Sequence, residues 1–218
     1  MNKYLEESEK YARHYDLGAV EQSYYGPELL FGLMYEYLQV KDRVLDIAIG
    51  TGLDAVLFKK AGARITGVDG AAEMIKICKE KKVADELIQL DFLRDTLPFP
   101  DNYFDLSVAN AIFHMIENPS GVIQEISRVL KQSGIFGFSV DEIRTGKPGG
   151  YNKIGKQGIA RKKHPESGLY MYRHSDEFIT KLCQKSGLEI LKKTEYLTFR
   201  GKENTDDFYF TAYVTRNK

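Results

Sequence analysis

The stretch Val44-Leu45-Asp46-Ile47-Ala48-Ile49-Gly50-Thr51-Gly52 constrains the fold of this chain more than any other. An apolar run carries one carboxylate, Asp46, breaks into a loop with two glycines, and then enters a helical pattern. In α/β proteins, a strand followed by a glycine turn and a helix start brings backbone N–H groups close to a small ligand. The stretch therefore predicts an α/β sheet with a ligand site at this turn.

Strand and helix patterns alternate along the rest of the chain. Apolar runs predict strands at 43–47, 64–69, 86–90, 104–109 and 135–140, with helices at 53–62, 71–80 and 119–131 between them. A further helix is expected after Ser175, and alternating patterns at 188–197 and 208–215 predict an antiparallel pair at the sheet edge. This order predicts the α/β class, with a doubly wound, mostly parallel seven-stranded sheet that has an antiparallel edge strand.

The chain is long enough for one domain, with 218 residues of which 43% are hydrophobic. We expect a single domain with four parts: an N-terminal helical cap at 1–40, a ligand-binding core at 41–140, a basic loop or lid at 141–174, and a C-terminal helix with edge strands at 175–218. The third part is rich in Gly and Lys and has little periodicity. It is either a solvated basic loop or a lid whose charge would suit an anionic substrate group.

The composition argues against several classes of partner. Lys plus Arg and Asp plus Glu both number 31, so no overall field favours nucleic acid or an anionic membrane. No apolar run approaches the roughly 18 residues that span a bilayer, and the N-terminus is too polar for a signal peptide. Cys78 and Cys183 lack paired spacing, and the histidines are scattered, so we expect reduced thiols and no metal site. These features predict a cytoplasmic monomer or homodimer.

Three successive predicted strands end on an aspartate: Asp46, Asp69 and Asp91. The segment 50–55 also fits the dinucleotide pattern G-x-G-x-x-A, with Asp69 suitably placed for ribose hydroxyls, so a nicotinamide or flavin enzyme has to be weighed. In that interpretation Asp46 would be a charge within a covered strand, at a cost of several kcal/mol. A carboxylate that faces the ligand crevice costs less and indicates a ligand that carries a cation.

The core also resembles the class I S-adenosylmethionine-dependent methyltransferases, whose fold is Rossmann-like. Their ordered motifs are similar to 44–52, Gly67–Ile75, Gln89–Phe92, Phe104–His114 and the turn Ser127–Gly134. Outside the core, Tyr25–Leu30 and Tyr172–Ser175 resemble predicted small-molecule methyltransferases of the TPR-associated and Williams–Beuren-region types. One position departs from the pattern, because Ala48 stands where many members have a glycine. Since a methyl group is the smallest possible change, we expect binding to survive.

The resemblance implies S-adenosylmethionine as cofactor and a role for each matching residue. Asp46 and the glycine loop would hold the methionine part, and Asp69 would accept the two ribose hydroxyls. Asp91 would accept from the adenine amino group. The implied cofactor-binding set is Asp46, Ala48, Gly50, Gly52, Asp69, Gly70, Met74, Asp91, Phe92, Ala109 and Asn110, with Met74 and Phe92 packing on adenine and Ala109 and Asn110 beside the methyl donor.

The methyl acceptor is less constrained. Positioning and desolvation can supply much of the catalysis of methyl transfer, and a general base is optional. His114 is the candidate base, with a packed side chain as the alternative, and Tyr25, Arg173 and His174 are candidate substrate contacts. The segment 110–113 lacks the Asn/Asp-Pro-Pro-aromatic pattern of enzymes that methylate amino groups of nucleic acids, which favours a small-molecule acceptor.

These observations predict an S-adenosylmethionine-dependent methyltransferase that acts on a small molecule, with no nucleic-acid or membrane partner. Two alternatives stay open. The chain could bind the cofactor without catalysis, as a regulatory protein, or it could be the nicotinamide-dependent oxidoreductase weighed above.

Overall fold

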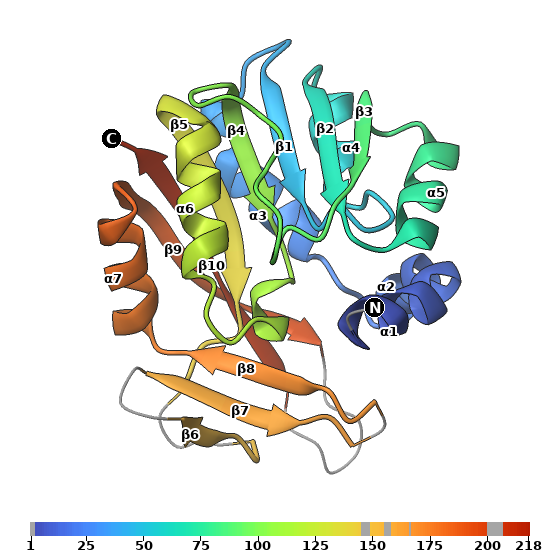
Figure 1. Cartoon of the computed structure of the whole chain (residues 1–218), viewed down its shortest axis with the longest axis vertical. Coiled ribbons are helices and arrows are strands. Elements are labelled where there is room, and N and C mark those ends of the chain that lie inside the picture. Colours follow the sequence, from blue (N-terminus) through green and yellow to red (C-terminus); the bar gives the residue numbers. More distant parts are fainter. Residues whose placement is uncertain (1–2, 145–148, 155–157, 166, 200–206) are drawn as a thin grey trace.

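A computed structural model describes residues 3–144, 149–154, 158–165, 167–199 and 207–218. Its centre is a seven-stranded sheet in the order β3-β2-β1-β4-β5-β10-β9 (Figure 1). The strands of this sheet are β1 (Arg43–Ile47), β2 (Arg64–Asp69), β3 (Glu86–Gln89), β4 (Phe104–Ala109), β5 (Leu130–Val140), β9 (Leu188–Phe199) and β10 (Phe208–Asn217).

The first five strands are parallel, and β10 runs antiparallel to both β5 and β9. The predicted fold class is confirmed, and the antiparallel strand lies one position in from the edge. The sequence explains this position, because β10 has a continuous buried run at Phe210–Thr215, which suits a strand covered on both faces. In contrast, β9 alternates between buried and exposed residues, as an edge strand does.

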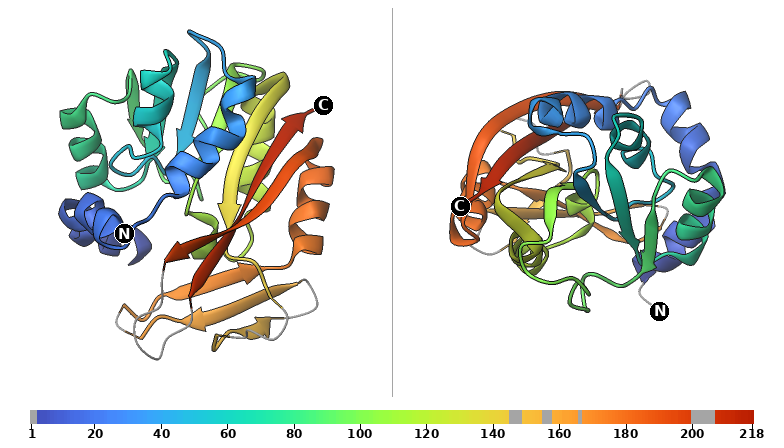
Figure 2. Two further views of the ribbon diagram at one scale, coloured as in Figure 1. Left: turned by 180° about the vertical axis from the view of Figure 1, so that it is seen from behind. Right: turned by 90° about the horizontal axis from the view of Figure 1, so that it is seen from above.

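Helices cover both faces of the sheet (Figure 2). On one face lie α6 (Ser120–Val129) and α7 (Asp176–Lys185), and on the other lie α3 (Gly26–Met34), α4 (Ala55–Lys60) and α5 (Ala72–Lys81). The alternation of side chains along β1 supplies both layers, because Leu45 and Ile47 belong to the first cluster and Val44 to the second. The sheet is therefore doubly wound, as predicted.

The segment expected as an N-terminal helical cap, 1–40, divides into two parts. Helix α3 packs on the sheet, whereas α1 (Lys3–Tyr11) and α2 (Tyr15–Glu21), joined by a 3₁₀ turn at Ala12–His14, form the cap. Both helices lie at the edge of the sheet where the parallel strands have their carboxyl ends (Figure 1). The cap is therefore placed beside the predicted ligand site.

The segment expected to be an irregular basic loop contains a second sheet. Its strands β6 (Asn152–Ile154), β7 (Ile159–Lys163) and β8 (Tyr170–His174) are antiparallel, in the order β6-β7-β8. The expectation of an irregular loop is wrong for these residues. A buried ion pair explains why this insertion is structured. Arg173 Nε lies 2.9 Å from Asp141 Oδ1 at the end of β5, and the Tyr151 ring lies 4.1 Å from the Arg173 guanidinium. The insertion is thus attached to the main sheet.

Both cysteines, Cys78 and Cys183, are buried and free, and burial raises the pKa of each thiol to about 12. They are packed side chains with little thiolate character.

Within the described part of the chain, none of the helices has the length and apolar character needed to cross a bilayer.

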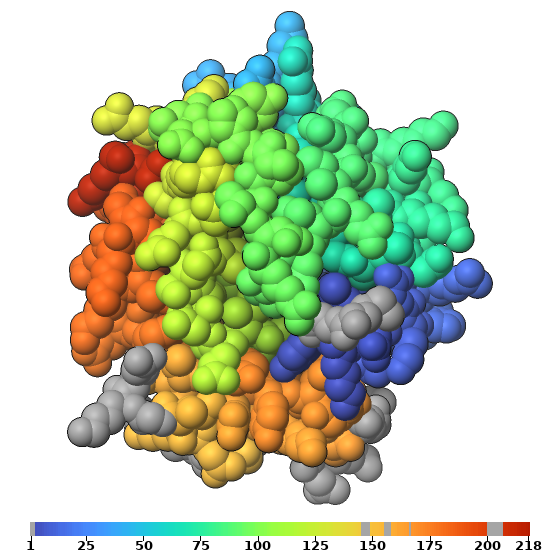
Figure 3. Space-filling view, viewed as in Figure 1, coloured from blue at the N-terminus to red at the C-terminus, as the bar shows by residue number. Residues whose placement is uncertain are grey.

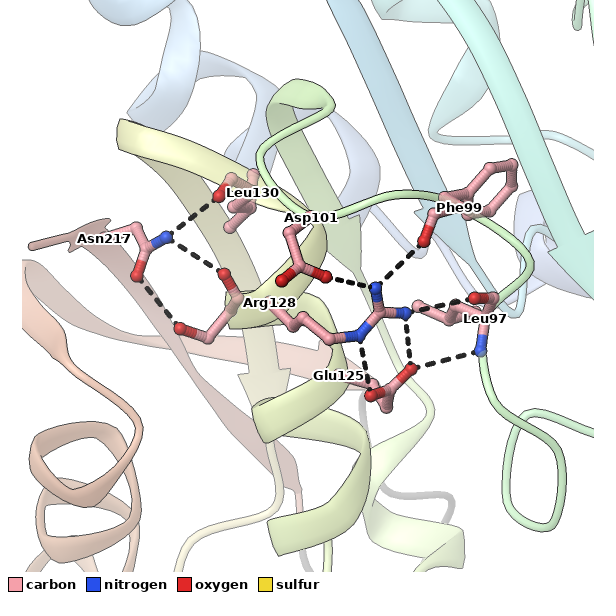
Figure 4. A network of polar contacts seen from close by, with 8 residues as sticks. Leu97, Phe99, Asp101, Glu125, Arg128, Leu130 and Asn217 are labelled. Carbon is pink, nitrogen blue, oxygen red and sulfur yellow. Dashed lines mark hydrogen bonds and ion pairs between the residues drawn. The ribbon is translucent and has the colours of Figure 1, made fainter.

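Arg128 joins α6 to the turn before β4 (Figure 4). Its guanidinium donates to the Glu125 carboxylate at 2.9 and 3.0 Å, to the Asp101 carboxylate at 2.8 Å, and to the carbonyl oxygens of Leu97 and Phe99 at 3.1 and 2.9 Å. Nearby, Asn217 donates to the Leu130 carbonyl at 3.0 Å. The bonds of Arg128 fix the Pro-rich turn at 97–102, between β3 and β4.

Replacement of Arg128 by Ala should lower the free energy of unfolding by about 2 kcal/mol, because two backbone carbonyls and two carboxylates lose a charged donor. Urea unfolding measures the change. Lys181→Ala is the control, since Lys181 pairs with Glu177 on the exposed face of α7 and should contribute less than about 0.5 kcal/mol. Equal stabilities of the two variants would contradict the role given to Arg128.

Candidate functional site

A cavity of about 670 Å³ lies at the carboxyl ends of β1, β2 and β4. Three parts of the chain enclose it: the strand ends, the N-terminal cap, and the insertion through residues of the turn and strand at 164–171. In the space-filling view, the cap (blue) and the insertion (orange) adjoin below the green segments that follow the strands (Figure 3). Its volume is in the range of cofactor and substrate pockets.

The structure brings six of the predicted site residues to the cavity wall: Ala48, Gly50, Asp69, Met74, Asn110 and His114. The others lie off the wall. Among the predicted cofactor contacts these are Asp46, Gly52, Gly70, Asp91, Phe92 and Ala109, and among the substrate contacts Tyr25, Arg173 and His174. The cavity therefore adjoins the strand ends named from the sequence, and only part of the predicted set lines it.

Asp69 organises the loop that begins the site. Its carboxylate accepts from the Gly50 N–H at 2.9 Å and from the Ala71 N–H at 2.8 Å. Each carboxylate oxygen has a second acceptor position, so Asp69 can also accept from ligand hydroxyls. The loop itself is left-handed at Ala48 (φ 58°) and Gly50 (φ 54°). This conformation costs Ala48 roughly 1–2 kcal/mol and explains the preference for glycine at that position.

Three carboxylates, Asp46, Asp54 and Asp69, are enclosed within this corner of the fold. Burial raises the pKa of all three, well above the usual range for Asp46 and to about 7 for Asp54, and the groups also repel one another. In the described part of the chain, Asp46 Oδ2 is buried without a hydrogen-bond partner. The corner therefore favours a ligand that carries positive charge.

A chain of hydrogen bonds orients Asn110 at the end of β4. Its Nδ2 donates to Asp54 Oδ1 at 3.0 Å, and its Oδ1 accepts from the Ser139 hydroxyl at 2.7 Å. Ser139 in turn accepts from the Ala111 N–H at 2.9 Å. The sequence reasoning missed Asp54 and Ser139. Of these two residues, the sequence pattern could have indicated only Asp54, because it is an acidic residue two positions after Gly52.

His114 lies on the cavity wall, with its ring 5.4 Å from that of Phe210. Burial lowers its pKa to about 4, and the neighbouring His174 contributes to this shift. Its Nδ1 is buried with no partner among the described residues. The imidazole is therefore neutral at pH 7.

The three predicted substrate contacts have other surroundings. Arg173 is engaged with Asp141, and His174 has its Nε2 3.1 Å from the Glu117 carbonyl oxygen. Tyr25 is 43% exposed and packs against the ring of Tyr196. These contacts connect the insertion and the chain before α3 to the core.

The predicted adenine contacts Asp91 and Phe92 also lie outside the cavity. Asp91 is within 3.5 Å of Arg94, and Phe92 packs against the apolar cluster under α6.

Among the described residues, there is no group of three His, Cys, Asp or Glu side chains that could hold a metal ion.

Acidic residues of the N-terminal cap connect it to the site. Glu9 accepts from the N–H groups of Ala72 and Glu73 at 2.6 and 2.7 Å, so it caps α5 from a distant part of the chain. Asp16 pairs with Lys81 and accepts from the Thr51 hydroxyl. The sequence reasoning missed both acids, because nothing distinguishes them from other charges of a polar helix.

Comparison with known proteins agrees with this architecture. Residues 45–138 match the family described as a methyltransferase domain. An uncharacterized methyltransferase of Bacillus subtilis is 33% identical over 111 residues, which are 48% of this chain and 44% of that protein. The chain spans about half the length of the curated relatives it matches.

Solved structures share the fold. A SAM-dependent methyltransferase from Methanosarcina mazei is 18% identical, with a TM-score of 0.68 over 85% of this chain and 96% of that one. A Burkholderia thailandensis 1,6-didemethyltoxoflavin-N1-methyltransferase with bound S-adenosylhomocysteine is 14% identical, with a TM-score of 0.70 over 99% of this chain and 88% of that one.

The fold is that of the S-adenosylmethionine-dependent methyltransferases among the solved structures. The match to a methyltransferase domain over residues 45–138 and the shared fold make S-adenosylmethionine the cofactor that the architecture implies. The residues present fit this cofactor, because Asp69 has free acceptor positions for hydroxyls and the buried, unpaired Asp46 oxygen belongs to a corner that favours a cation.

Asp54→Asn should change the pH dependence of stability. Because the pKa of Asp54 is raised to about 7, the folded state binds a proton more tightly than the unfolded state, and stability is lost as the pH rises from about 4 through 7. The variant should therefore be more stable than wild type at pH 8, by up to about 4 kcal/mol, and equal to it below pH 4. Urea unfolding at several pH values measures this difference.

Asp85→Asn is the matched control. Although burial opposes the shift, Lys59 and the Ile65 N–H lower the pKa of Asp85, so this carboxylate stabilises the fold above pH 4. The control should be less stable than wild type at pH 8. Parallel pH profiles for the two variants would contradict the charge environment described for Asp54.

Glu9→Ala should loosen the cap over the site. Loss of a helix-capping carboxylate costs about 1 kcal/mol, which corresponds to roughly fivefold faster amide exchange where the cap opens locally. Hydrogen exchange of residues 3–21 measures the effect, with Glu6→Ala on the same helix as control. Equal exchange in both variants would show that Glu9 does not hold the cap.

Proposed function

We propose that this chain transfers a methyl group from S-adenosylmethionine to a small-molecule acceptor. The observation that carries the proposal is the cavity at the strand ends, whose wall includes Asp69 and Gly50 together with Asn110, His114 and Phe199. One end suits the cofactor, and the remaining space suits an acceptor. The structural neighbour named for methylation of 1,6-didemethyltoxoflavin supports a small-molecule acceptor for this fold.

In this proposal the cofactor supplies an electrophilic methyl group on a sulfonium. Asp69 accepts the ribose hydroxyls while it keeps its bonds to the loop, and Met74 packs against adenine. Gly50 and Asn110 adjoin the methionine part. The predicted roles of Asp91 and Phe92 at adenine belong to the same proposal, and Asp46 acts through its charge because it is buried behind the loop.

The charge of the site argues against the nicotinamide alternative. A dinucleotide would bring a pyrophosphate with two negative charges to the loop beside Asp46, Asp54 and Asp69. Among the described residues that line the cavity there is no Lys or Arg to balance them. S-adenosylmethionine carries an ammonium and a sulfonium, so the same carboxylates attract it.

The enclosure of the space beyond Asn110 favours an enzyme over a cofactor-binding regulatory protein. Methyl transfer requires the acceptor to be held in line with the sulfonium and away from water. The insertion and the cap provide such an enclosure, since Tyr4 of α1 donates to the Tyr170 carbonyl of β8 at 2.7 Å.

Asp69→Ala should weaken S-adenosylhomocysteine binding about 100-fold, because two hydrogen bonds to a charged acceptor are worth roughly 3 kcal/mol. Isothermal titration measures the affinity. Asp95→Ala is the control, as Asp95 is exposed on the segment after β3 and does not line the cavity. Unchanged affinity in Asp69→Ala would refute the assignment of the ribose site, and stabilisation of the wild type by NAD alone would refute the cofactor.

A further inference from the structure

We propose that the acceptor is an uncharged, planar molecule and that its nucleophile is a nitrogen with a free lone pair, an amine or an N-heteroaromatic ring. This inference rests on the proposed function and names the class of acceptor that the same cavity takes. Two properties of the described part of the wall carry it: it has no Lys or Arg to balance an anion, and its candidate base, His114, is poorly suited to deprotonate an acidic acceptor.

The charges on the wall exclude an anionic acceptor. Among the described residues that line the cavity, the Asp and Glu side chains are Asp69, assigned to the cofactor, and Glu7, which pairs with Lys10 at 2.8 Å. None is Lys or Arg. An acceptor carboxylate or phosphate would lose its hydration without a compensating cation, which is costly.

The basic residues of the insertion do not change this balance. Arg161 of β7 lies over the outer ring of Tyr170 at 4.5 Å, and Lys162 lies 6.0 Å from the ring of Tyr151. Neither lines the cavity. The positive charge of these two residues of β7 is therefore directed away from the cavity wall.

The candidate base His114 is poorly suited to remove a proton from an alcohol, thiol or ammonium. It lies in an apolar setting that disfavours the imidazolium, with Phe210 beside its ring and a buried Nδ1 without a partner in the described chain. Its pKa of about 4 is several units below those of such acceptors. A neutral nitrogen needs no deprotonation before it attacks, so a hydrogen bond from the imidazole can only position it.

The shape of the wall suits a flat ring. The rings of Tyr24 and Phe199 lie 5.4 Å apart on one side. Tyr170 and the flexible side chains Met115 and Met171 line the cavity as well. Aromatic faces and methionines pack well against planar apolar ligands.

The step is balanced without a further reactant. The nitrogen lone pair forms the new N–C bond as the S–C bond breaks, and the electron pair of that bond stays on sulfur. The nitrogen gains the positive charge that the sulfonium loses. A proton on the methylated amine then leaves to water, whereas a methylated ring nitrogen stays cationic and is expelled into solvent.

The test compares three two-ring compounds of matched size as ligands of the S-adenosylhomocysteine complex: isoquinoline, 2-naphthol and 2-naphthoate. Isothermal titration at pH 7.5 should give isoquinoline at least tenfold tighter binding than 2-naphthoate. In assays with labelled S-adenosylmethionine, isoquinoline should be methylated and 2-naphthol should not. Preference for 2-naphthoate, methylation of 2-naphthol, or binding of none of the three would overturn the inference.

Two variants test the missing counter-charge directly. Met171→Lys and Met115→Lys each add a cation to the wall and should raise the affinity for 2-naphthoate at least tenfold while that for isoquinoline falls. Two positions are used so that a fold defect in one leaves the other informative, and Lys163→Met on the exposed end of β7 is the control. Unchanged selectivity in both folded variants would overturn the inference.

The outcome separates the inference from the proposed function. Titration of wild-type protein with S-adenosylhomocysteine alone comes first. Absence of this binding would overturn both the proposed function and the inference. Binding of S-adenosylhomocysteine together with preference for 2-naphthoate would overturn the inference only.

Discussion

The enclosure of three carboxylates at one corner of the sheet is the constraint on which the site depends. Asp46, Asp54 and Asp69 repel one another, and burial makes the charged form of each less favourable. The fold relieves this repulsion only in part, through donors from the loop and from Asn110. What remains is a preference for a cationic ligand, and the cofactor supplies the positive charge that the chain itself does not.

The core of the fold could be predicted because each local signal agrees with the global arrangement. Apolar runs of strand length end on polar residues, and the bounds expected for β1, β2 and β4 are those observed. The glycine loop and Asp69 follow from the same pattern, since a strand–turn–helix unit leaves few places for a ligand. Asp46 was placed at the right turn, but its side chain is buried behind the loop and not on the cavity wall.

The parts that could not be predicted depend on contacts between distant residues. The insertion is ordered by Asp141 and Arg173, which are 32 positions apart, and its Gly and Lys content conceals the strands. Glu9 caps α5 from 63 positions away. Neither partner carries a local signature, because an acid on a polar helix looks the same whether it meets solvent or a helix N-terminus. Prediction therefore succeeds for the periodic core and fails for the elements that close over it.

The periodic core and the elements that close over it contribute differently charged walls to the cavity. The core provides the acidic end, which was fixed by local sequence signals. The cap and the insertion provide the other end, which is aromatic and, in the described residues, without Lys or Arg. In the proposed reaction, methyl transfer to a neutral nitrogen would move positive charge from the sulfonium toward this second end, where the Glu7 carboxylate is already paired with Lys10. The cofactor product of that reaction would carry no sulfonium charge, so the acidic end would attract it less strongly. The same asymmetry that favours binding before transfer thus favours release after it.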